Sequence, residues 1–114
     1  MARLSRVKEK ASRILMELPV ERAFHFHTTI GGYTQKYATS LNRFGELLRE
    51  IDVSSLEFHL ERKDFENWIK HLGDDVLALQ IAKLRSKKLT GEVLRSKLVE
   101  TVEKRCKKLR EMTS

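Results

Sequence analysis

Four histidines are the first residues in this chain whose type could support metal chemistry. His25 and His27 stand two positions apart in the segment FHFH, where an extended backbone would place both imidazoles on one face. His59 or His71 could join them, because neutral imidazole is a common metal ligand. No third ligand follows the pair at a spacing typical of a zinc site. We therefore expect hydrogen-bonded or exposed histidines and no metal.

A second polar set in the middle of the chain could support acid/base catalysis or a nuclease-type metal site. It consists of Asp64, Glu66, His71, Asp74 and Asp75. Asp64 and Asp74, however, precede segments of helical periodicity, where Asp is a favoured N-cap and acidic side chains interact well with the helix dipole. Helix capping explains the set, so we predict no catalytic residues and no enzymatic activity.

Three smaller features suggest chemistry only weakly. The segment IGGYT, residues 30–34, matches neither a phosphate-binding P-loop nor a dinucleotide fingerprint, so its glycines predict a turn and no cofactor. Most aromatic residues fall at predicted core positions, which leaves Tyr33 as a candidate for stacking on a nucleic-acid base. Cys106 is the single cysteine; it excludes an internal disulfide, fits a core position and favours a reducing, cytoplasmic setting.

The basic side chains are unevenly distributed along the chain, and this is its most informative property. From residue 83 to the end there are 11 Lys and Arg against 4 Asp and Glu, whereas residues 1–82 hold 12 of each. Within that neutral part, residues 1–13 carry 5 basic and 1 acidic side chain. Both ends are therefore positive and the middle is negative, a pattern that attracts phosphate or acidic protein surfaces.

Each basic end is predicted to be an amphipathic helix. Apolar residues at three- and four-residue spacing indicate a helix over residues 3–18 that Pro19 ends. Its apolar positions are Leu4, Val7, Ala11, Ile14, Leu15 and Leu18, and its basic arc, opposite this stripe, is Arg3, Arg6, Lys10 and Arg13. If this helix and the last one are neighbours, their basic faces could merge.

Thr90 is predicted to open the last and longest helix, which runs to about Met112. One arc of this helix is basic, at Lys97, Lys104, Lys107 and Lys108, and the opposite stripe is apolar, at Leu94, Leu98, Val102, Cys106 and Leu109. Arg105 and Arg110 flank the arc. Arg95 lies near the stripe, where its stem could pack while its guanidinium reaches solvent.

The central segment, residues 22–84, must position these ends. Alternation in FHFHT and the glycine pair after it predict a short hairpin or ordered loop near residues 22–38, with Phe24 and Phe26 on one side. Helical segments follow. Their predicted N-caps are Thr39 or Ser40, Asp52 with a capping box of Ser54 and Glu57, Asp64 and Asp74. Gly73 is predicted to close the helix that Asp64 begins.

These elements predict a single domain of residues 1–114, all-α or mostly α. We expect a compact bundle of about five to six helices with one short hairpin. No apolar run approaches the roughly 18 residues that a membrane span requires, and the N-terminus lacks the apolar stretch of a secretory signal.

Three blocks of the central segment resemble an uncharacterised, mainly archaeal family of small proteins that is known as a domain of unknown function. The blocks are FHFHT-IGGYT, SLEFH and DFENWI-LGD, and the resemblance runs from about Arg22 to Leu109. It implies a compact, chiefly helical domain and transfers no catalytic residue. Gln35 departs from the family pattern, in which a small residue, often Gly, follows the Tyr-Thr pair.

We therefore expect a non-enzymatic module that contacts nucleic-acid phosphates, in RNA or a ribonucleoprotein, through its basic terminal helices. The expected contact residues are Arg3, Arg6, Lys10, Arg13, Lys87, Lys88, Lys97, Lys104, Lys107 and Lys108. The alternative is a protein-interaction or assembly domain, in which basic ends meet an acidic partner or the acidic middle of a second copy. Attachment of residues 3–18 to a membrane surface is a weaker possibility.

Overall fold

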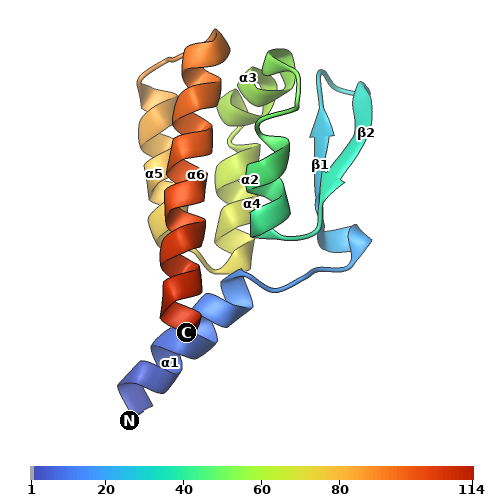
Figure 1. The fold of residues 1–114 in the computed structure, drawn as a ribbon. Coiled ribbons are helices and arrows are strands. Elements are labelled where there is room, and N and C mark those ends of the chain that lie inside the picture. Colours follow the sequence, from blue (N-terminus) through green and yellow to red (C-terminus); the bar gives the residue numbers. More distant parts are fainter. Residues whose placement is uncertain (1) are drawn as a thin grey trace.

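A computed structural model describes residues 2–114, with side chains described from Ser5 onward. As predicted, the described chain is mostly helical, with six helices and one hairpin (Figure 1). The elements are α1 (Ala2–Ile14), the short 3-10 helix η1 (Val20–Arg22), β1 (Phe24–His27), β2 (Tyr33–Ala38), α2 (Leu41–Leu47), α3 (Val53–Glu61), α4 (Asp64–Leu72), α5 (Asp75–Ser86) and α6 (Gly91–Thr113).

The long helix α6 organises the bundle, since α1, α2, α3 and α5 all pack against it. Its predicted apolar stripe is buried, from Leu94 through Val102 to Leu109. Helix α2 comes especially close to it at Gly45, where an added Cβ would lie 3.2 Å from Cγ1 of Val102. Figure 1 shows α5 beside α6 on one side of the bundle and the hairpin on the side away from α5.

The predicted hairpin is present as an antiparallel pair of strands, with His25 opposite Tyr37 and a bulge between His25 and His27. Phe24 and Phe26 are buried, and the intervening histidines lie on the other face, as alternation predicted. Phe26 stacks on Phe44 of α2 at a ring-centroid distance of 5.8 Å. This aromatic contact attaches the hairpin to the helical body.

The first helix is shorter than predicted, since it ends at Ile14 and not at Leu18. The backbone N–H of Leu18 instead donates to the carbonyl oxygen of Thr39 at 2.7 Å. A residue that precedes proline disfavours helical backbone angles, which explains why Leu18 itself lies outside the helix. The predicted burial of Val7 is wrong as well: its side chain is 42% exposed, because the first half of α1 projects beyond the body (Figure 1).

Three of the predicted helix boundaries are confirmed in detail. Ser40 caps α2 by accepting from the backbone N–H of Arg43 at 3.1 Å. Asp74 caps α5 by accepting from the N–H of Leu77 at 3.1 Å. Gly73 closes α4 with φ +98°, a left-handed conformation that glycine adopts without steric cost.

Two predicted caps are wrong. Asp52 caps α3 as predicted, but the capping box of Ser54 and Glu57 is not formed. Glu57 accepts from the N–H of Gly91 at 2.9 Å, so it satisfies the start of α6 and not its own helix. Asp64 lies inside the first turn of α4, whose cap position is Lys63. The carboxylate of Asp64 is already engaged by His59, which explains why it makes no cap.

Candidate nucleic-acid interface

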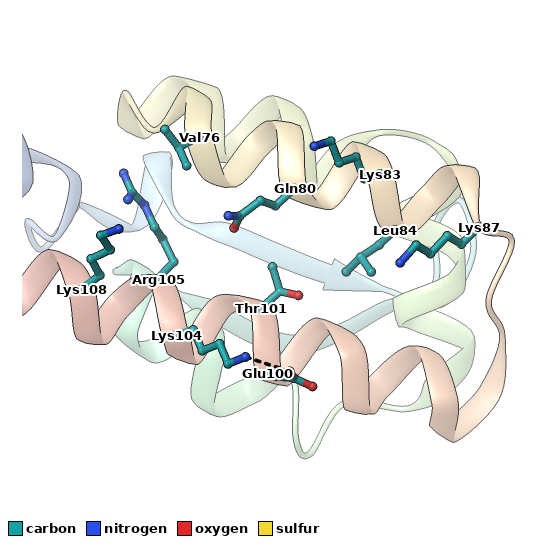
Figure 2. A pocket seen from close by; sticks show the side chains of 10 residues that line it. All are labelled: Val76, Gln80, Lys83, Leu84, Lys87, Glu100, Thr101, Lys104, Arg105 and Lys108. Carbon is teal, nitrogen blue, oxygen red and sulfur yellow. Dashed lines mark hydrogen bonds and ion pairs between the residues drawn. The ribbon is translucent and has the colours of Figure 1, made fainter.

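A groove lined mainly by polar and charged residues runs between α5 and α6, and we call it the α5/α6 groove (Figure 2). Its volume is about 360 Å³. The groove is lined by Val76, Gln80, Lys83, Leu84, Lys87, Glu100, Thr101, Lys104, Arg105 and Lys108. It therefore brings together lysines from two segments that are separated in the sequence.

Helical spacing places these side chains along the two walls. On α5, the sequence steps by four, three and four residues from Val76 through Gln80 and Lys83 to Lys87. The same steps on α6 lead from Lys97 through Thr101 and Lys104 to Lys108. Since residues three and four apart share one face of a helix, each series forms a stripe. The buried side chains of each helix, such as Ile81 and Val102, hold the two stripes against one body.

The groove has a strong positive charge. Four lysines and one arginine line it, against a single carboxylate, that of Glu100. Lys104 Nζ lies 3.0 Å from Glu100 Oε1, the one interaction drawn as a dashed line in Figure 2, and this hydrogen bond lowers the pKa of Glu100. Within the described part of the chain, Lys83, Lys87 and Lys108 form no ion pair.

Arg105 is the exception among these cations, because a buried carboxylate holds it. Its Nε donates to Asp74 Oδ2 at 2.8 Å, and its Nη2 donates to Oδ1 at 3.0 Å. The Asp74 side chain is fully buried and that of Arg105 is 12% exposed. The pair ties α6 to the start of α5, so Arg105 shapes the groove without adding net charge.

The other predicted contact residues are distributed around this groove. Arg6, Lys10 and Arg13 are exposed on α1, which packs against α6. The side chain of Arg3 lies outside the described residues. Lys88 is exposed in the turn after α5, and Lys97 is exposed on α6 one turn before the groove residue Thr101.

Lys107 is separated from its predicted neighbours. It lines a different hollow of about 450 Å³, between α2 and α6, together with Glu46, Glu103 and Arg110. The predicted lysine arc therefore divides, with Lys104 and Lys108 turned toward α5 and Lys107 toward α2.

The sequence analysis did not single out Lys83, Gln80 or Thr101, which line the groove. A signal was present, since Lys83 and Lys87 are four residues apart on the face of α5 that lacks the buried Ile81. The sequence does not show that α5 packs beside α6. This packing places the Lys83 face of α5 opposite Thr101.

His27 of the hairpin lies near His59, with ring centroids 5.9 Å apart, and both ring nitrogens of His59 are hydrogen-bonded. His59 Nε2 accepts from the backbone N–H of His27 at 2.7 Å, and His59 Nδ1 donates to Asp64 Oδ2 at 2.8 Å. His25 donates from Nε2 to the carbonyl oxygen of Val20. His71 is exposed on α4. In the described residues, no group of three or more His, Cys, Asp or Glu side chains is arranged to hold a metal.

The acidic set does not converge on one site either. Asp64 contacts His59 and Arg62, Glu66 contacts Arg85 at 2.7 Å, and Asp74 contacts Arg105. Cys106 is buried, and burial raises the pKa of its thiol to about 11, so the thiol is protonated at neutral pH. These groups stabilise the fold.

Comparison with known proteins gives one decisive result. The sequence profile of a family of unknown function, DUF5752, matches residues 4–103. The chain belongs to this family. The match begins within α1, so the DUF5752 domain includes the first basic helix, which the sequence resemblance had left out. Comparisons of this DUF5752 protein with curated proteins and with solved structures give no match.

In this DUF5752 protein the groove joins α6 to α5, whereas most of the expected contact residues lie on α1 and α6 and only Lys87 and Lys88 lie at the end of α5. Across the described residues, no helix is both long and apolar enough to cross a membrane.

Proposed function

We propose that this DUF5752 protein is a non-enzymatic nucleic-acid-binding module and that the α5/α6 groove holds the phosphate backbone, with RNA or a ribonucleoprotein as the favoured partner. The observation that supports this most is the set of four lysines on the two facing stripes of the groove. Three of them have no ion-pair partner in the described chain. Lysine ammonium groups bind phosphate as point charges and release counterions when they do so.

The placement of the lysines fits a chain of phosphates better than a single phosphate. At a rise of about 1.5 Å per residue, Lys83 and Lys87 are about 6 Å apart along α5, as are Lys104 and Lys108 along α6. Figure 2 shows the four spread along the whole length of the groove, from Lys108 at one end to Lys87 at the other. A linear polyanion can contact all four, whereas a single phosphate can contact only those nearest it.

The lining also favours binding that is independent of base sequence. It contains no aromatic side chain on which a base could stack, and its cations are lysines, which act without directional base contacts. The exposed Arg6, Lys10 and Arg13 of α1 would add further phosphate contacts, because α1 packs against the helix that carries Lys108.

A salt titration tests this function. Fluorescence anisotropy of a labelled single-stranded RNA should give an affinity that falls steeply between 50 and 200 mM salt. If four lysines each neutralise one phosphate, the slope of log K against log salt is about −3. Affinity that does not change with salt, or no binding at the lowest salt, would contradict the proposal.

The second candidate is an assembly domain, and the projecting first half of α1 favours it. Val7 is exposed there among basic residues, so this half of the helix offers both apolar and cationic contacts to an acidic partner or a second copy. Light scattering of purified protein at several salt concentrations separates the two candidates, because assembly would appear without any nucleic acid and would dissociate as salt rises.

A further inference from the structure

The middle of the α5/α6 groove carries groups that lysine-phosphate binding does not require. Gln80 from α5 and Thr101 from α6 face each other there, and Figure 2 shows no hydrogen bond joining them to each other or to the other side chains drawn. Thr101 is half-buried, whereas the four lysines are exposed. Gln80 is exposed, as the lysines are. The middle of the groove therefore carries two neutral polar groups between cationic ends, the half-buried Thr101 and the exposed Gln80, and we call these two groups the floor and the lysines the rims.

The hydrogen-bonding chemistry of this floor differs from that of the rims. A lysine can only donate, which matches the acceptor oxygens of phosphate. The amide of Gln80 and the hydroxyl of Thr101 can both donate and accept. A ligand that presents a donor between its phosphates can therefore replace water at an acceptor of the floor.

RNA and DNA differ in the sugar that lies between successive phosphates. The ribose 2′-hydroxyl of RNA is both a donor and an acceptor, and it is the group by which a protein tells RNA from DNA. The deoxyribose-phosphate backbone has no donor. Base edges also carry donors, but the lining has no aromatic side chain to hold a base within the groove.

We infer that the α5/α6 groove selects single-stranded RNA, with rim lysines on the phosphates and with Gln80 and Thr101 on ribose 2′-hydroxyl groups. This inference rests on the proposed function. A single strand is specified because Thr101 is half-buried between two packed helices, whose axes typically lie 8–10 Å apart. In duplex RNA the 2′-hydroxyls line a wide, shallow minor groove and cannot descend between the helices to reach Thr101.

The test compares four ligands of the same base sequence: single-stranded RNA, single-stranded DNA, 2′-O-methyl RNA and duplex RNA. The expected order places single-stranded RNA about 5- to 10-fold tighter than DNA, which corresponds to one or two ordinary hydrogen bonds. The 2′-O-methyl RNA should bind like DNA, because the methyl group removes the donor and keeps the oxygen. Duplex RNA should bind more weakly than the single strand.

Two variants locate the effect. Thr101→Val removes the hydroxyl while it keeps the side-chain shape, and Gln80→Met removes the amide at an exposed position where the fold does not depend on it. Each should weaken RNA binding about 3-fold and leave DNA binding unchanged. Lys83→Met, as the matched control, should weaken RNA and DNA binding equally.

The outcomes separate the inference from the function on which it rests. Equal, salt-dependent binding of RNA and DNA would overturn the inference and leave the proposed function in place. Tighter binding of duplex RNA, or an unchanged RNA-to-DNA ratio in both Thr101→Val and Gln80→Met, would overturn it too. Failure of every ligand to bind would remove both.

Discussion

Arg105 and Asp74 form a buried ion pair that joins the last helix to the start of α5, with donor-acceptor distances of 2.8 and 3.0 Å. Asp74 simultaneously caps α5 through the N–H of Leu77. The carboxylate of Asp74 therefore caps α5 and binds α6. Because these two helices form the walls of the α5/α6 groove, Asp74 holds both walls together at the end of the groove nearest α1.

Asp74→Ala should destabilise the protein strongly. It removes the cap of α5 and leaves the guanidinium of Arg105 largely buried without a partner, a combination that typically costs about 3–5 kcal/mol. Urea denaturation measures the change in the free energy of unfolding. Asp75→Ala, at the exposed neighbouring position, is the matched control and should cost less than about 1 kcal/mol. Similar losses in both variants would show that the ion pair contributes little.

Glu57 should stabilise the start of α6 more than Thr90 does, although Thr90 occupies the N-cap position of that helix. Thr90 occupies the cap position of α6, but its side chain makes no capping bond, and Glu57 of α3 accepts from the N–H of Gly91 instead. Glu57→Ala should therefore cost about 1 kcal/mol in the free energy of unfolding and Thr90→Ala less than about 0.5 kcal/mol. Thermal denaturation of the two variants side by side decides the point. The reverse order would contradict the assigned cap.

Acid should weaken the attachment of the hairpin to α3. Burial lowers the pKa of His59, and this effect outweighs the hydrogen bond from His59 to Asp64, which raises it. The unfolded chain therefore binds the proton first as pH falls below about 6.5, so the free energy of unfolding decreases from there down to the folded pKa. The limiting slope is about 1.4 kcal/mol per pH unit. Above about pH 6.5 this group contributes no pH dependence.

The geometry of His59 explains this direction. Its Nε2 accepts from the N–H of His27, so protonation there would set two donors against each other at 2.7 Å. Asp64, Arg62 and His27 are the ionisable groups that face this ring. Urea denaturation between pH 5 and 8 measures the slope, and His59→Gln should reduce it. An unchanged slope in that variant would assign the pH dependence to other groups.

Gln35→Gly should stabilise the protein, an unusual expectation for a strand. Gln35 has φ +68° in β2, a conformation that costs a residue with a side chain roughly 1 kcal/mol, and glycine avoids this cost. After the larger entropy of an unfolded glycine is subtracted, a gain of about 0.5 kcal/mol remains. Lys36→Gly, one residue later, should lose stability instead. Thermal denaturation that shows a loss in both variants would contradict the strain at Gln35.

The departure of Gln35 from the family pattern was visible in the sequence, but its meaning required the backbone angle. Other features also divide into those that local sequence predicts and those that depend on the folded structure. Apolar periodicity predicted the buried stripe of α6 and the inward side of Phe24 and Phe26, because burial depends on local spacing. The role of Glu57 was misjudged and the ion pair of Arg105 was not predicted, because their partners, Gly91 and Asp74, lie 34 and 31 residues away. No local pattern records such contacts.

The phosphate-binding residues stay a prediction, and the structure shows only where their side chains lie. Charge segregation predicted that lysines of α6 contact phosphate; of these, Lys104 and Lys108 line the groove. The other wall comes from α5, whose Lys83 was not among the expected residues, while Lys107 turns toward α2. Helical spacing alone groups Lys104, Lys107 and Lys108 on one arc of α6. The packing of α6 between α5 and α2 decides which of these lysines lines which hollow.

A matched pair of triple variants tests the central claim most directly. One replaces the unpaired groove lysines Lys83, Lys87 and Lys108 with Ala; the other replaces Lys36, Lys70 and Lys107, which are equally exposed and lie outside the groove. Both lose three positive charges. The affinity for one single-stranded RNA is measured from 50 to 200 mM salt. The groove variant should bind at least about 10-fold more weakly at 50 mM salt, with its salt slope reduced from about −3 to about −1, and the control should stay within about threefold of the parent protein. Equal losses in the two variants would contradict a binding site in the α5/α6 groove.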